Sequence, residues 1–189
     1  MATVDDIPSW SRLAPHIAIS YAKLQDESQA RELAEAARVA EEAAAEWLAA
    51  WPGGDLDAKD EAGWSALQRA AEAGQAAAAA ELLRRPGVEV NGVEPAKGQP
   101  ALVLASRGGH AAVVRVLLAC AEVEVNHAVR GDYTALFIAA QEGKEAVVEL
   151  LLAHPAVDAN QADQRPLATL LRRTPLYQAV SFGREAVVR

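Results

Sequence analysis

The sequence predicts an all-α fold in which helix-turn-helix units with extended finger loops stack into a solenoid. Three observations support this class. A leucine-centred motif recurs about every 34 residues, alanine accounts for 44 of the 189 residues, and glycine or proline marks the expected helix ends. A period of this length is typical of helical repeat proteins, and alanine has the highest helix propensity.

The repeat is defined by two markers that share one register. A leucine starts each copy, with spacings of 35, 34 and 40 residues, and an asparagine follows the first three leucines after 24 residues. Two independent markers with the same spacing are unlikely to coincide by chance, so they indicate a true internal repeat. The leucines are Leu67, Leu102, Leu136 and Leu176, and the asparagines are Asn91, Asn126 and Asn160.

This register divides the chain into a non-repeating lead-in, 1–28, followed by a repeat domain, 29–189. The domain is expected to hold a degenerate cap, 29–56, three full units and a truncated fourth unit; the units are 57–90, 91–125, 126–159 and 160–189. In the cap, Leu33 occupies the leucine position, and glutamates give the polar surface that a terminal repeat shows to water. The alternative is one amphipathic helix from Gln29 to Trp51, because no glycine or proline interrupts that stretch.

The third unit shows how each element follows from its residues. Thr134 is a suitable N-cap for a first helix, and Gly143 is suited to end it in the left-handed conformation. A second helix is expected from Glu145 to Ala153, with one apolar stripe made of Ala146, Val147, Leu150 and Leu151. One helix pair cannot bury its own stripe, so the units must stack.

The segments between units alternate valine with glutamate, as in Val88-Glu89-Val90 and Val123-Glu124-Val125. Such alternation predicts short strands or extended fingers.

Composition excludes several classes of protein. The net charge of -8 argues against nucleic acid as a partner, and no uncharged run approaches the roughly 20 residues needed to span a membrane. A single cysteine, Cys120, forms no internal disulfide, and the N-terminus lacks the pattern of a signal peptide. We therefore expect a monomer in the cytoplasm or nucleus.

With these elements in place, the chain resembles the ankyrin-repeat family over about residues 29–189. The resemblance implies a finger, a helix, a tight turn and a second helix in each unit, and a protein-binding role. The residues that carry it are Thr174-Pro175-Leu176-Tyr177, Thr134-Ala135-Leu136-Phe137, Ala70-Ala71, Ala139-Ala140, Gly109-His110, Val113–Leu118, Val147–Leu152 and the finger from Asp57 to Ser65.

The chain departs from the family pattern at two places. The histidine that often follows the leucine is replaced by Gln68, Val103, Phe137 or Tyr177, so the usual hydrogen bonds at that position are not expected in their usual form. The fourth unit carries six extra residues between Asn160 and Leu176. That insertion, with its leucines and arginines, is either a partner-specific extension or a tolerated loop.

No catalytic constellation is evident. The four histidines lie far apart and lack metal-ligand spacing, and Cys120 has no partnering base nearby in sequence. His110 follows the turn glycine and is expected to be structural. The sequence therefore predicts no enzyme activity, cofactor or metal.

Stacking places equivalent positions side by side, so a column of residues forms one strip of surface. The column three residues before each leucine faces the concave groove in ankyrin repeats and holds Trp64, Gln99, Tyr133 and Arg173. Tryptophan, tyrosine and arginine are enriched in binding hot spots. A second polar column on the first helices holds Glu72, Arg107 and Gln141. We expect these seven residues to bind a partner; the alternatives are that Trp64 and Tyr133 only pack against the next finger and that the second column is merely solvated.

The preferred function is thus protein-protein recognition through the groove and fingers, without catalysis. Two alternatives remain. The chain could be the N-terminal targeting part of a larger protein, such as a kinase, ubiquitin ligase or channel, or it could be a structural spacer.

Overall fold

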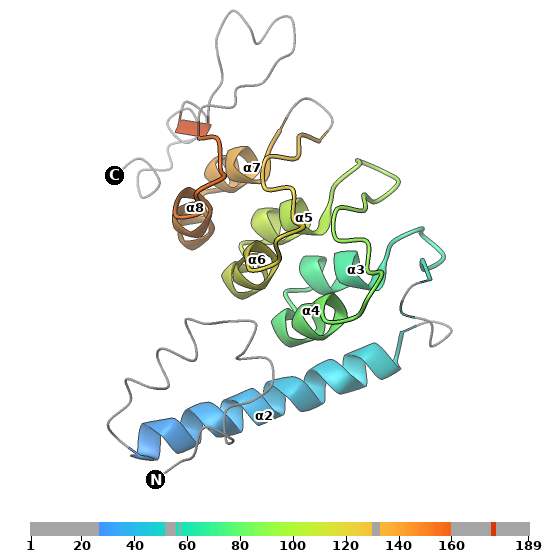
Figure 1. Cartoon of the computed structure of the whole chain (residues 1–189), viewed down its shortest axis with the longest axis vertical. Coiled ribbons are helices and arrows are strands. Elements are labelled where there is room, and N and C mark those ends of the chain that lie inside the picture. Colours follow the sequence, from blue (N-terminus) through green and yellow to red (C-terminus); the bar gives the residue numbers. More distant parts are fainter. Residues whose placement is uncertain (1–26, 52–55, 57, 130–132, 160–174, 177–189) are drawn as a thin grey trace, which may run out of the picture.

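The computed structural model describes residues 27–51, 56, 58–129, 133–159 and 175–176. Within these ranges the chain forms one long helix followed by three pairs of short helices (Figure 1). The long helix is α2 (Glu27–Ala49), and the pairs are α3 (Ala66–Glu72) with α4 (Ala76–Leu83), α5 (Ala101–Gly108) with α6 (Ala111–Leu118), and α7 (Ala135–Glu142) with α8 (Glu145–Leu152). The all-α solenoid predicted from the repeat is confirmed.

Among the first helices of the pairs, α3 and α7 have side-chain N-caps, and α5 and α7 end at a glycine. The Thr134 hydroxyl accepts a hydrogen bond from the Phe137 amide at 3.2 Å, and Ser65 and Gln68 form a reciprocal capping box. Gly109 and Gly143 end their helices with φ of 78° and 67°, a left-handed conformation that glycine adopts without steric cost. The predicted N-cap and C-cap of the third unit are therefore confirmed.

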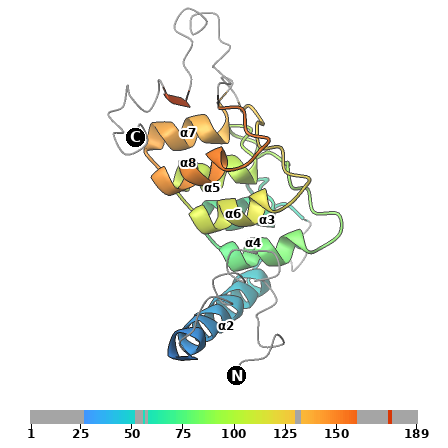
Figure 2. The ribbon, with the colours of Figure 1, turned by 60° about the vertical axis from the view of Figure 1, so that its left-hand side comes forward.

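The helices form two layers (Figures 1 and 2). The inner helices α3, α5 and α7 pack on one another beside the finger loops, and the outer helices α4, α6 and α8 form the second layer. Alanines occupy the contacts between inner helices: Ala70, Ala105 and Ala139 are each 0% exposed. Because alanine has only a methyl group, adjacent helices can approach closely along this layer.

The outer helices bury a stripe that differs in one position from the predicted one. On α8, Val147, Val148 and Leu151 are buried and Leu150 is partly buried, whereas Ala146 is exposed. The stripe is therefore centred on Val147 and Leu151, with Val148 on its flank in place of Ala146. Inclusion of Ala146 was wrong, because burial on α8 extends to Val148 and not to Ala146.

The finger loops are extended, and the described residues form isolated bridges there instead of strands. Val93 pairs with Pro100, and Val129 pairs with Tyr133. The valine-glutamate segments belong to no strand, so the extended-finger alternative is the correct one. Each of these bridges lies within one finger.

The asparagine marker joins one unit to the next. The Asn91 side chain donates to the Glu122 carbonyl at 2.8 Å and accepts from the Glu124 amide at 2.9 Å. Asn126 repeats both bonds with the Ala156 carbonyl and the Asp158 amide. An asparagine amide offers a donor and an acceptor at once, which explains why this residue recurs with the repeat period.

Gln68 performs a similar role at the position where the family often has histidine. Its Nε2 donates to the Gly92 carbonyl of the following finger at 2.7 Å, and its Oε1 accepts from the Ser65 amide at 2.9 Å. His110 lies 3.0 Å from the Glu72 carbonyl and so also connects two units through its Nε2. The structural role predicted for His110 is supported by this contact.

The N-terminal cap is one continuous helix, not a helix pair. Residues 27–49 form α2, which packs against α4, so this stretch has the single helix of the alternative interpretation. No glycine or proline interrupts this stretch, and the helix can therefore propagate through the position where the other units turn. Its exposed face carries an Arg38 side chain paired with Glu35 and Glu42.

Several predicted features lie outside the described residues. These are the lead-in, the six-residue insertion, Arg173 and nearly all of the truncated fourth unit. Of that unit the structure describes Pro175, which is buried, and Leu176, which is exposed.

Ser106 provides a prediction about the inner layer. It is 0% exposed, and its hydroxyl has no hydrogen-bond partner in the described structure; the corresponding residues of the other units are Ala71 and Ala140. An unsatisfied buried hydroxyl is destabilising. We expect Ser106→Ala to raise the free energy of unfolding by about 1 kcal/mol, measured by urea denaturation. A decrease in stability would show that the hydroxyl is satisfied in solution.

Candidate functional site

The predicted groove column occupies one equivalent backbone position in each described unit. The carbonyls of Trp64, Gln99 and Tyr133 accept hydrogen bonds from Asp60, Glu94 and Val129, at 2.8, 3.1 and 3.1 Å respectively. Each bond closes a finger immediately before its inner helix begins. The column therefore lies along one edge of the array, on the surface formed by the fingers and the inner helices, which we call the finger face.

In the first unit, Trp64 belongs to a charged cluster. The Arg69 guanidinium carbon lies 4.2 Å from the centroid of the Trp64 ring, a cation-π arrangement. Arg69 donates to Asp60 at 2.7 Å and to Glu72 at 3.1 Å. The ring and the guanidinium are therefore held in place before any partner arrives, and Glu72 is engaged by Arg69.

Asp60 organises this cluster through both carboxylate oxygens. Its Oδ1 accepts from the amides of Ala62 and Trp64, each at 2.9 Å, and its Oδ2 accepts from Arg69. Burial alone would raise the pKa of Asp60, but the hydrogen bonds from Trp64 and Arg69 and the positive charge of Arg69 outweigh it. The pKa of Asp60 therefore lies below its ordinary value of 3.8.

This lowered pKa gives a prediction about acid. A carboxyl whose pKa is lower in the folded state contributes stability above its unfolded pKa, and this stability is lost as the pH falls through the folded pKa. We expect the unfolding free energy of the wild type to exceed that of Asp60→Asn at pH 7, and the difference to shrink below about pH 4. Urea denaturation of both proteins between pH 7 and pH 3 measures this difference in unfolding free energy. A difference that does not change with pH would contradict the lowered pKa of Asp60.

Between the second and third units, the finger face contains a hollow of about 330 Å³. Four of the seven predicted residues line it: Gln99, Arg107, Tyr133 and Gln141. The remaining lining comes from Ala96, Lys97, Val129, Ile138 and Glu142. The two columns inferred from the repeat thus meet in one concave surface with a few polar groups and an apolar wall, as is usual for binding sites.

The polar groups of this hollow are held by one another. Arg107 Nη1 donates to Gln99 Oε1, and Gln141 Nε2 donates to Glu142 Oε1 at 3.1 Å. Gln99 itself is only 4% exposed, so it acts by positioning Arg107 more than by direct contact with a partner.

Tyr133 and Trp64 are partly buried against the core. The Tyr133 ring stacks on Phe137 with a centroid distance of 4.6 Å. This stacking and the cation-π contact of Trp64 are therefore with residues of the same unit, and part of the surface of Tyr133 lines the hollow.

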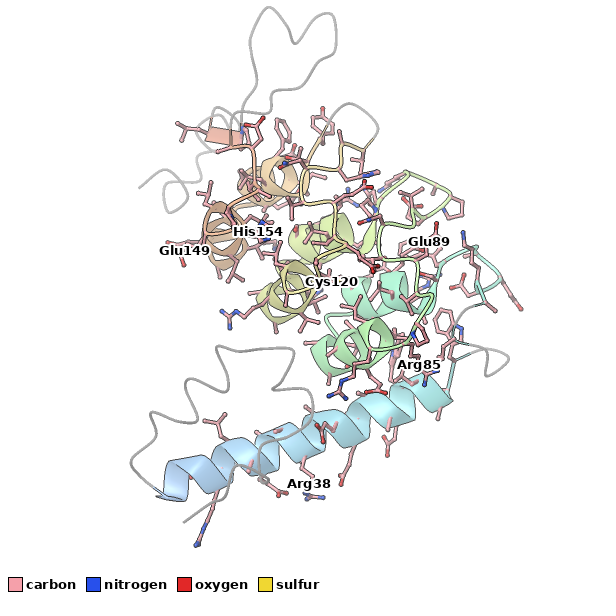
Figure 3. All side chains as sticks on the ribbon, viewed as in Figure 1. Arg38, Arg85, Glu89, Cys120, Glu149 and His154 are labelled. Carbon is pink, nitrogen blue, oxygen red and sulfur yellow. The ribbon has the colours of Figure 1, made fainter. Side chains whose placement is uncertain are left out.

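A second hollow, of about 410 Å³, lies between α2 and α4. Its lining includes Glu81 and Arg84, which form an ion pair at 3.0 Å, and Arg85, labelled in Figure 3. None of the predicted residues lines it. Although it is larger, we favour the finger-face hollow because two columns of the repeat converge there and its walls include an aromatic ring.

Sequence reasoning missed several residues of the finger face. Asp60 and Arg69 were not singled out, although an acidic residue and an arginine flanking Trp64 were a usable signal. Lys97 and Glu142 come from a finger and from the end of an inner helix, and only the folded array brings them together.

The described ranges contain no group of three or more His, Cys, Asp or Glu side chains arranged to hold a metal. Cys120 is a free, partly buried thiol at the end of α6. Among the described helices, none combines the length and the apolar character needed to cross a membrane.

Helix pairs that stack on their neighbours define the class of helical repeat proteins. The family comparison is more specific: the model of ankyrin repeats (3 copies) matches residues 33–129 and 122–189. The chain belongs to the ankyrin-repeat family, whose members are generally protein-protein interaction modules and typically non-catalytic. No curated protein matches the chain closely enough to count as a relative.

Proposed function

We propose that the chain binds a protein partner through its finger face, without catalysis or a cofactor. The observation that carries this proposal is the hollow between the second and third units, in which four residues inferred from the repeat lie together. The proposed contact residues are Trp64, Tyr133, Arg173, Glu72, Arg107 and Gln141, and Gln99 contributes by positioning Arg107.

The fixed geometry of this face favours binding. The fingers are closed by backbone hydrogen bonds, and Arg69 and Arg107 are held by neighbouring side chains. A surface that is already ordered loses little conformational entropy when a partner binds, so a few aromatic and arginine contacts suffice for affinity.

The test compares partner capture by three forms of the chain. The wild type, the Trp64→Ala/Tyr133→Ala variant and a control, Arg115→Ala/Glu149→Ala, are used as baits in extract of the source cells. Arg115 and Glu149 are exposed on the outer helices α6 and α8, and Figure 3 shows Glu149 on the side away from the fingers. Captured proteins are then purified, and their affinity is measured by calorimetry.

We expect the finger-face variant to lose at least about tenfold in affinity, since hot-spot truncations cost more than about 1 kcal/mol, and the control to bind as the wild type does. Thermal unfolding of each variant is followed in parallel. Tyr133→Leu keeps apolar volume against Phe137 and replaces the double variant if the latter does not fold. Unchanged affinity in folded finger-face variants would refute the proposal and favour the structural spacer.

A further inference from the structure

Two arginines of the finger face, Arg69 and Arg107, differ in their hydrogen-bond partners. Arg69 in the first unit has two carboxylate partners, Asp60 and Glu72. Arg107, partly buried in the second unit, has a neutral partner, the side-chain amide of Gln99. Among the described residues, none forms an ion pair with Arg107. Among the described residues, Arg69 is therefore neutralised by carboxylates, whereas Arg107 is held by a neutral amide.

The Arg107 guanidinium is partly buried and has no carboxylate partner among the described residues, so it has N–H donors with which to bind an anionic group. Arginine carries five N–H donors in a planar fork that matches a carboxylate with two parallel hydrogen bonds. Gln99 uses one acceptor oxygen, and it fixes the orientation of the guanidinium. Removing an arginine from water without an anion is unfavourable, so this position favours a ligand that supplies one.

The rest of the lining specifies the neighbours of that anion. Lys97 adds a second, exposed positive charge from the second finger. Val129, Tyr133 and Ile138 form an apolar wall. On the α7 side, Glu142 contributes a negative charge, which disfavours a doubly charged phosphate more than a single carboxylate.

Resting on the proposed function, we propose that this hollow binds a partner segment in which a glutamate or aspartate lies next to an apolar side chain. The carboxylate pairs with Arg107 and is attracted by Lys97. The apolar side chain packs against Tyr133 and Ile138. Arg107 thus determines the charge preference of the site.

The experiment uses the whole 189-residue chain and three pools of fluorescent, end-blocked peptides. The pools are identical except at one position beside a phenylalanine or leucine, where they carry Glu, Gln or Lys. Binding is measured by fluorescence anisotropy at low salt for the wild type, Arg107→Gln, Arg107→Glu and a matched control, Arg115→Gln. Arg115 is exposed on α6 of the same unit, on the outer layer, so its replacement removes the same charge from the other side of the array.

We expect the wild type and Arg115→Gln to bind the Glu pool about tenfold more tightly than the Gln pool, which corresponds to one charge-assisted hydrogen-bonded pair. The preference should disappear in Arg107→Gln, turn toward the Lys pool in Arg107→Glu, and weaken as salt is added. Circular dichroism verifies that each variant is folded.

Three results would overturn the inference: equal affinity of the wild type for the Glu and Gln pools, a preference that persists in Arg107→Gln, or no measurable binding of any pool. A captured partner that depends on Tyr133 but binds Arg107→Gln unchanged would overturn this inference alone and leave the proposed function intact.

Discussion

Replacing Leu117 with alanine is expected to lower the free energy of unfolding by about 3–5 kcal/mol. Leu117 is 0% exposed and lies on α6, the outer helix of the middle unit, which packs against α4 and α8. Truncation removes buried methyl and methylene groups and leaves a cavity that the surrounding helices fill only in part, which is why such changes cost this much. Because both neighbouring units pack on α6, the loss weakens two interfaces at once.

The effect is measured by urea denaturation followed by circular dichroism. Leu152→Ala is the matched control, because Leu152 is 54% exposed on α8 and the same atoms are removed; we expect its cost to be below about 1 kcal/mol. Equal losses in the two variants would show that the outer layer is not packed as the structure has it.

The second large effect is expected from Ala105→Leu. Ala105 is 0% exposed on α5, which packs between α3 and α7. A leucine adds three carbon atoms where the helices are in close contact, so α5 must shift or the new side chain must adopt a strained rotamer. Overpacking of this kind typically costs about 1–3 kcal/mol.

Ala112→Leu is the control for this substitution. Ala112 is exposed on α6 of the same unit, and a leucine there has room, so we expect a change within about 0.5 kcal/mol. Thermal unfolding compares the two variants, and binding of the captured partner tests whether the finger face is also displaced. If Ala105→Leu is as stable as Ala112→Leu, the alanines of the inner layer do not set the distance between units.

Much of the fold follows from local signals that recur with the repeat. Caps such as Thr134, turn glycines such as Gly143 and the leucine spacing act within a few residues, and the structure has them where the sequence places them. At the N-terminal end the stretch in the repeat register forms one helix, because no residue that breaks a helix lies between Gln29 and Trp51.

The candidate site could be predicted only in part. The columns containing Tyr133 and Arg107 follow from the repeat, because equivalent positions of stacked units must lie side by side. The side chains that these residues contact cannot be inferred from the repeat. Gln99 holds Arg107 from a different element, and Asp60 links Trp64 to Arg69 through both of its oxygens.

The sequence by itself determined that this protein is a helical repeat array, where its units begin, and which positions share one face, because helix capping, turns and periodicity are local properties of the chain. Only the tertiary structure decided which partners the charged side chains of the described residues meet, since that depends on how each finger folds against the inner helix of its own unit. Arg69 and Arg107 are the same residue type on the same face, yet one meets two carboxylates and the other an amide. The electrostatic character of the finger face therefore follows from the fold of each finger against its own inner helix.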